Sequence, residues 1–139
     1  MHKPIKNSKK EIINFKNNLI DDLKMHKNGF NFSKKYSKSI DEIIKSIVSE
    51  IDGNQHEYAL IAVGGYGRSE MCLYSDIDLL LIYKKQDSFI KSLISNLNNN
   101  LWDTGLDIGI SFLTIKHAVA DSKKDIKTLT KFLESRHLL

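Results

Sequence analysis

The residues best suited to chemistry in this chain lie close together, within residues 63–82. Gly64, Gly65 and Gly67 follow a short apolar run that is typical of a buried strand. Because glycine has no Cβ atom, the backbone N–H groups of such a turn can approach an anion closely. Arg68 adds a fixed positive charge suited to phosphate oxygens. The first half of the segment therefore predicts a phosphate-binding turn.

Two aspartates, Asp76 and Asp78, stand one residue apart at the start of a second apolar run. In a strand, residues i and i+2 point to the same face, so both carboxylates should project side by side. Two such carboxylates repel each other unless a cation neutralises them, and ligands that are all oxygen favour Mg²⁺ or Mn²⁺. A phosphate-binding turn beside such a metal pair is suited to phosphoryl or nucleotidyl transfer.

The combination of these parts is more specific than any part alone. The glycines do not form the GxGxxG dinucleotide fingerprint, and the GxxxxGK[ST] pattern of a P-loop is absent. The remaining pattern is a strand, a Gly-Gly turn and an Asp-x-Asp pair that opens an apolar strand. This pattern resembles the nucleotidyltransferase superfamily. Residues 64–70 and 75–80 resemble, more narrowly, the N-terminal domain of the PII uridylyltransferase/uridylyl-removing enzyme family, and the similarity covers roughly residues 55–139.

The resemblance assigns roles to individual residues of the turn. It implies that Gly64 and Gly65 bind the nucleotide triphosphate, with Arg68 assisting and Ser75 also on the nucleotide. Its implied cofactor is Mg²⁺, with Mn²⁺ as an alternative.

The resemblance also implies the metal-binding and catalytic residues. Asp76 and Asp78 would hold the metal, and Asp107, on the polar side of a later strand, is the candidate for a third carboxylate. Asp107 could equally be a solvated aspartate at a sheet edge. Asp103 is the substitute for it, although a helix end is a poorer place for a ligand.

The implied activity is transfer of UMP from UTP to a tyrosine hydroxyl of a PII-type signalling protein, with release of pyrophosphate. The sequence departs from the family at Ser69, where glycine is frequent, at Ile110, where histidine is usual, and at Leu113, where arginine is usual. The chain also stops before the family's further domains. The alternative is therefore a truncated remnant that binds nucleotide, a partner or a complementary fragment and catalyses little.

The elements that must position these residues follow from hydrophobic periodicity, which predicts an α+β (α/β) fold with a small mixed sheet flanked by helices. We expect residues 1–54 to form a helical pair packed on a nucleotidyltransferase core at residues 55–139, within a single domain. The pattern predicts helices at residues 9–25, 33–51, 87–103 and from 115 onwards, and strands at residues 58–63, 77–83 and 106–113. The core side of the last helix should carry Ile126, Leu129 and Leu133, with Phe132 as a further candidate.

Composition narrows the class of protein further. The chain has 139 residues with 41% hydrophobic and 27% charged residues, which excludes collagen-like and wholly disordered chains. Its net charge of +4 comes from lysines in the first fifty residues, and the only arginines are Arg68 and Arg136. Specific nucleic-acid recognition relies on arginine, so nucleic acid is an unlikely partner. No apolar run is long enough for a membrane span, and the expected location is cytoplasmic.

Three further side chains have competing interpretations. Tyr66 could stack on a nucleotide or be a buried tyrosine of the turn. Cys72, the single cysteine, is expected to be a packed thiol, and one cysteine excludes a disulfide framework. Trp102 is expected to anchor the end of its helix.

Overall fold

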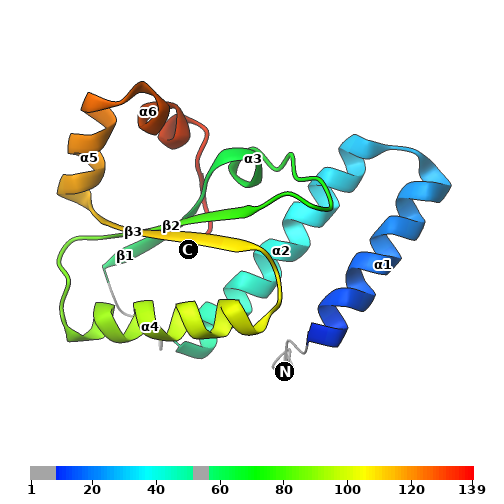
Figure 1. Ribbon diagram of the computed structural model, residues 1–139, viewed down its shortest axis with the longest axis horizontal. Coiled ribbons are helices and arrows are strands. Elements are labelled where there is room, and N and C mark those ends of the chain that lie inside the picture. Colours follow the sequence, from blue (N-terminus) through cyan, green and yellow to red (C-terminus); the bar gives the residue numbers. More distant parts are fainter. Residues whose placement is uncertain (1–8, 52–56) are drawn as a thin grey trace.

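A computed structural model describes residues 9–51 and 57–139 of the chain (Figure 1). This part contains six helices and four strands. In chain order they are α1 (Lys9–His26), α2 (Gly29–Ile51), β1 (Tyr58–Ala62), α3 (Gly64–Gly67), β2 (Ile77–Tyr83), α4 (Ser88–Asp103), β3 (Ile108–Thr114), α5 (Ile115–Lys124), α6 (Ile126–Leu133) and β4 (Arg136–His137).

The strands form one mixed sheet in the order β3-β2-β1-β4. β1 runs antiparallel to β2 and to β4, whereas β2 and β3 are parallel. Parallel neighbours need a crossover connection, and α4 supplies it between β2 and β3. The predicted α+β fold with a small mixed sheet is confirmed.

One face of the sheet carries α2 and α4, and the other side carries α3, α5 and α6 (Figure 1). Alternate residues of β2 explain this layering. Ile77, Leu79, Leu81 and Tyr83 belong to the hydrophobic core that they share with the apolar stripes of α2 and α4. Asp78, between two of these residues, must therefore project toward the side of α3 and α6.

The helices at the N-terminus pack as an antiparallel pair, and α1 extends beyond the sheet (Figure 1). The longer helix α2 places Tyr36, Ile40, Ile44 and Ile47 in the core. The predicted boundary between a helical pair and a catalytic core falls within residues 52–56, outside the described residues, so that division of the chain stays a prediction. No helix in the described ranges has the length and hydropathy needed to cross a bilayer.

The C-terminal region differs from the single helix that periodicity predicts. Asp125 divides it, because its side chain accepts hydrogen bonds from the Lys127 and Thr128 amides and thereby caps a new helix, α6. The helix ends at Leu133, and the chain then forms β4, which adds two residues to the edge of β1.

The expected core side of this helix is also wrong. Ile126 and Leu133 are 75% and 77% exposed, and Leu129 is exposed as well. Polar residues of α6 instead line a pocket beside Gly64 and Asp78. Two smaller predictions are also wrong: Trp102 is 86% exposed and does not pack as a helix anchor, and Cys72 is exposed and is not a packed thiol.

Candidate active site

The glycine-rich turn forms the short helix α3 directly after β1. Gly64 has φ +61°, a left-handed conformation that side chains with a Cβ atom rarely adopt. The Val63 amide donates to the Asp78 carbonyl oxygen at 3.0 Å, which fixes the start of the turn beside β2. At Gly67, a Cβ atom would collide with the carbonyl oxygens of Glu134 and Ala62. Gly67 is therefore glycine because three backbone segments meet there.

The Asp78 carboxylate lies between the turn and β3. A Cβ atom on Gly64 would stand 3.4 Å from Asp78 Oδ2, and one on Gly109 would stand 3.4 Å from Asp78 Oδ1. Asp78 and Gly109 are register partners, so the missing side chain on β3 leaves room for the carboxylate. The two glycines thus form a cradle around an oxygen pair of the kind that Mg²⁺ prefers.

The other two predicted carboxylates flank the same end of the sheet. Asp76 and Asp107 each precede a strand, and the Ile77 amide donates to the Asp107 carbonyl oxygen at 2.9 Å. Both side chains are exposed, as is that of Asp103 at the end of α4. Within residues 9–51 and 57–139, no three His, Cys, Asp or Glu side chains converge closely enough to hold a metal ion. The metal-binding role of the three aspartates stays a prediction.

Arg68, the cation expected to assist the triphosphate, is held by two carboxylates. Its Nε donates to Glu70 at 2.7 Å, and its Nη1 donates to Glu134 at 2.6 Å. These contacts, first the hydrogen bond to Glu70 and then the charge of Glu134, raise the pKa of the Arg68 guanidinium. A phosphate would have to compete with both carboxylates for this side chain.

Gly65 and Ser75 are the remaining residues that the resemblance places on the nucleotide. Gly65 is half-buried, and a Cβ atom added there would come no closer than 4.0 Å to other atoms. Ser75 is also half-buried, and its hydroxyl accepts a hydrogen bond from the Cys72 amide at 2.9 Å. That bond closes the loop before the aspartates. The predicted nucleotide contacts of both residues stay predictions.

A pocket of about 410 Å³ opens beside the cradle. Gly64 and Asp78 form one part of its wall, and residues of α6, with Glu134 directly after it, form the rest. No residue of α6 was expected at the site from the sequence, because its strong apolar periodicity favoured a core helix. The signal that could have found it is the polar spacing of Lys127, Thr130, Lys131 and Glu134.

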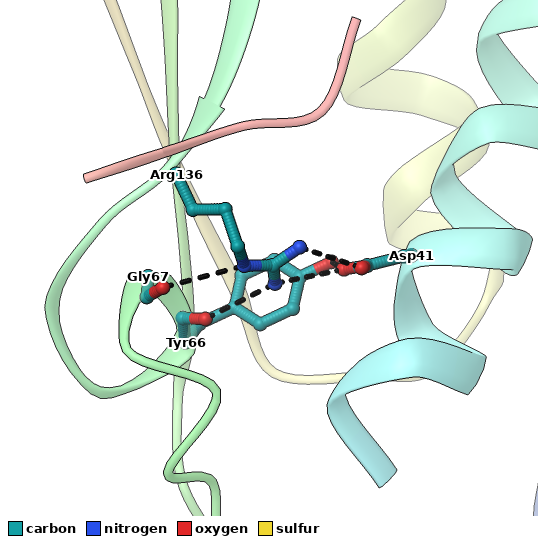
Figure 2. Close-up of polar contacts among 4 residues, drawn as sticks. All are labelled: Asp41, Tyr66, Gly67 and Arg136. Atoms are coloured by element: carbon teal, nitrogen blue, oxygen red, sulfur yellow. Dashed lines mark hydrogen bonds and ion pairs between the residues drawn. The ribbon is translucent and has the colours of Figure 1, made fainter. Parts of the chain in front are cut away.

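A network of polar side chains behind the turn joins three distant segments (Figure 2). The Tyr66 hydroxyl donates to Asp41 of α2 at 2.6 Å. Arg136 of β4 donates to both oxygens of Asp41, at 2.6 and 3.0 Å, and its guanidinium stacks on the Tyr66 ring. Arg136 also donates to the Gly67 and Tyr66 carbonyl oxygens at 3.3 Å. The network thus holds the turn by its backbone as well as by a side chain.

Burial and charge support this network. Tyr66 is only 1% exposed, so the buried-turn interpretation is confirmed and the stacking interpretation is wrong. Burial, followed by the hydrogen bond to Asp41, raises the pKa of the Tyr66 hydroxyl far above its usual range. The hydrogen bond to Asp41 likewise raises the pKa of Arg136. Sequence reasoning missed Asp41, although it is a carboxylate at the edge of the apolar stripe of α2, between Ser37 and Ile44.

The two departures from the family on β3 lie on different faces. Ile110 packs against the core with α2 and α4, so it faces away from Asp78. Leu113 alternates with Gly109 and lies on the same face as Asp78, farther along the strand. The change at Ile110 therefore leaves the carboxylate side of the sheet unaltered.

A mixed sheet with a glycine turn after one strand and Asp-x-Asp at the start of its neighbour defines a nucleotidyltransferase-type protein. A family profile described as "Putative nucleotidyltransferase DUF294" matches residues 15–111, and the chain belongs to this family.

Curated relatives agree with this assignment. The chain is 36% identical over 99 residues to the bifunctional uridylyltransferase/uridylyl-removing enzyme of Stutzerimonas stutzeri (strain A1501), which covers 70% of this chain and 11% of that protein. The enzyme of the same name from Burkholderia orbicola (strain AU 1054) is 36% identical over 104 residues, 74% of this chain and 12% of the relative. That from Pseudoalteromonas translucida (strain TAC 125) is 40% identical over 99 residues, 70% of this chain and 11% of the relative. The match thus spans only about a ninth of each relative.

Proposed function

We propose that this chain is a magnesium-dependent nucleotidyltransferase domain that transfers UMP from UTP to a tyrosine hydroxyl of a PII-type signalling protein and releases pyrophosphate. The observation that carries the proposal is the cradle in which Gly64 and Gly109 leave room for both oxygens of Asp78. The names of the relatives support UTP as the donor, and the motifs support the reaction type.

In this proposal Asp76, Asp78 and Asp107 hold Mg²⁺, or Mn²⁺ in its place. The bound ion would supply charge that lowers the pKa of the acceptor hydroxyl and steadies the leaving pyrophosphate. Gly64 and Gly65 let the triphosphate lie close to the backbone of the turn. We further propose a cytoplasmic location and no membrane or nucleic-acid partner.

The test is incubation of the chain with labelled UTP, Mg²⁺ and a purified PII protein, with Asp78→Ala as the blank. We expect label on the PII protein that requires Mg²⁺ and is lost in the Asp78→Ala variant. Circular dichroism should show that the variant stays folded, because the half-buried Asp78 side chain has no part in the core. ATP, GTP and CTP in parallel reactions determine the base. Label transfer that persists in the variant would contradict the proposal.

The engagement of Arg68 favours a second candidate function. Because Glu70 and Glu134 hold its guanidinium, the chain alone could bind Mg²⁺-UTP, a partner or a complementary fragment and transfer nucleotide slowly or not at all. Binding by calorimetry without label transfer would support this candidate. Glu134→Gln, which weakens one of the two ion pairs, should then raise the affinity for UTP.

A further inference from the structure

One wall of the pocket beside Asp78 belongs to α6, and its side chains have no role in the proposal above. Besides Gly64 and Asp78, the pocket is lined by Ile126, Lys127, Thr130, Lys131 and Glu134. Lys127, Thr130 and Lys131 stand at i, i+3 and i+4 on one face of α6, and Glu134 follows directly after the helix ends at Leu133. These polar residues line the pocket together with Ile126, whereas Leu129 and Leu133 of α6 are exposed.

The start of α6 is fixed by its cap. Asp125 accepts hydrogen bonds from the Lys127 amide, the Thr128 amide and the Thr128 hydroxyl, at 3.3, 3.0 and 2.7 Å. The Thr128 contacts are the main cause that lowers the pKa of Asp125. An ionised cap of this kind sets where the first turn begins, and with it the direction of Lys127 and Lys131.

Lys127 and Lys131 are the cationic side chains at the pocket that are not already engaged by a carboxylate. Glu134 is neutralised by Arg68, which also pairs with Glu70. Neither Lys127 nor Lys131 forms an ion pair with any residue of the described ranges. Among the residues that the structure describes, the pocket therefore has one carboxylate without a cationic partner, Asp78, and two ammonium groups without an anionic one, those of Lys127 and Lys131.

We propose that Lys127 and Lys131 bind the polyphosphate group of the donor nucleotide, the role that the resemblance implied for Arg68. This inference rests on the proposed function, because it takes the ligand of the pocket to be a nucleoside triphosphate. An ammonium group on a flexible stem binds phosphate as a point charge, and two of them four residues apart can contact neighbouring phosphates. The glycine turn on the opposite wall leaves room for that group.

The test is calorimetric titration of the double variant Lys127→Gln/Lys131→Gln with Mg²⁺-UTP, Mg²⁺-UMP and metal-free inorganic tripolyphosphate. The matched control is Lys85→Gln/Lys116→Gln, which removes the same charge from a pocket beyond the other end of β2. Since charge-assisted hydrogen bonds are the strong ones, we expect the α6 variant to bind UTP and tripolyphosphate at least about tenfold more weakly, and UMP with a smaller loss. The control should change little.

The outcomes separate this inference from the proposed function. Equal losses in both double variants would show a general charge effect and overturn the inference, as would unchanged binding in the α6 variant or no tripolyphosphate binding by the unmodified chain. If Asp78→Ala abolishes transfer while the α6 variant binds normally, the inference fails and the proposed function stands. If the α6 lysines bind tripolyphosphate but no nucleotide is ever transferred, the proposed function fails and the inference stands.

Discussion

Backbone conformation explains which positions of the turn tolerate a side chain. Gly64 and Ser69 both lie in the left-handed region, with φ +61° and +58°, but only one of them is glycine. The resemblance described above implies glycine as the frequent residue at the position of Ser69. That preference now has a physical reason, because a residue with a Cβ atom is strained in this conformation.

These conformations predict opposite effects of two substitutions. Gly64→Ala should lower the free energy of unfolding by about 1 kcal/mol and also weaken Mg²⁺-UTP binding, since the new Cβ atom would touch the Asp78 carboxylate. Ser69→Gly should leave stability equal or raise it by up to about 1 kcal/mol. Urea unfolding measures both. Gly29→Ala is the control, because a Cβ atom there meets nothing within 4 Å. A Gly64→Ala variant as stable as the unmodified chain would contradict the assigned conformation.

The Tyr66 hydroxyl predicts a dependence of stability on alkaline pH. The pKa of this hydroxyl in the folded chain is raised above the ordinary value of 10.0. The stability that the protonated hydroxyl contributes is therefore fully present below pH 10. Above it the unfolded chain loses the proton and the folded chain keeps it, and stability should fall by up to about 1.4 kcal/mol per pH unit. Tyr66→Phe cannot lose a proton and should lack this part of the decline. The free energy of unfolding of both proteins should be measured from pH 8 to 11. The same decline with pH in both proteins would contradict the prediction.

The connection between α4 and β3 determines where Asp107 and Gly109 lie. Thr104 is buried there, and its hydroxyl donates to the Leu101 carbonyl oxygen at 2.6 Å and accepts from the Leu106 amide at 3.1 Å. The Thr104 side chain thus connects the last turn of α4 to the segment that leads into β3.

Replacing this threonine with its apolar isostere tests the connection. Thr104→Val leaves the buried Leu106 amide without its partner, which should cost about 1–3 kcal/mol and weaken Mg²⁺-UTP binding by displacing Gly109. Thermal unfolding and calorimetry measure the two effects. Ser49→Ala, which removes a similar bond to Ser46 on an exposed part of α2, should change little. Equal effects of both substitutions would show that burial of this bond is unimportant.

The elements that could be predicted from the sequence are those whose hydrophobic pattern is compatible with only one type of secondary structure and one buried face. The stripe of α2 and the apolar run of β2 fit one arrangement each, and both elements lie where the pattern predicted them. The start of α6 could not be predicted in this way, because its apolar spacing matches a buried helix and only the tertiary packing leaves it exposed. The two residues of β4 are too few for any periodicity, and they pair only because β1 offers a free edge.

Both arginines of the chain join the turn to the C-terminal segment. Arg68 reaches from the turn to Glu134, and Arg136 reaches back from β4 to the turn and on to Asp41 of α2. Asp41 and Arg136 are 95 positions apart in the sequence. The candidate site therefore depends on contacts between the first helices, the turn and the end of the chain, and local sequence could not reveal them.

These contacts between α2, the turn and the end of the chain predict that α2 and the sheet unfold together. Removing the carboxylate in Asp41→Ala leaves a partly buried guanidinium and a buried hydroxyl without their partner, which should cost about 2–4 kcal/mol. Hydrogen exchange should show the same loss of protection in α2 and in β2, because both belong to one core. Lys35→Gln, which breaks the exposed ion pair between α1 and α2, should cost less than about 1 kcal/mol. If α2 loses protection in Asp41→Ala while β2 keeps it, the helix is a separate unit, and the turn must then be held in place by the C-terminal segment alone.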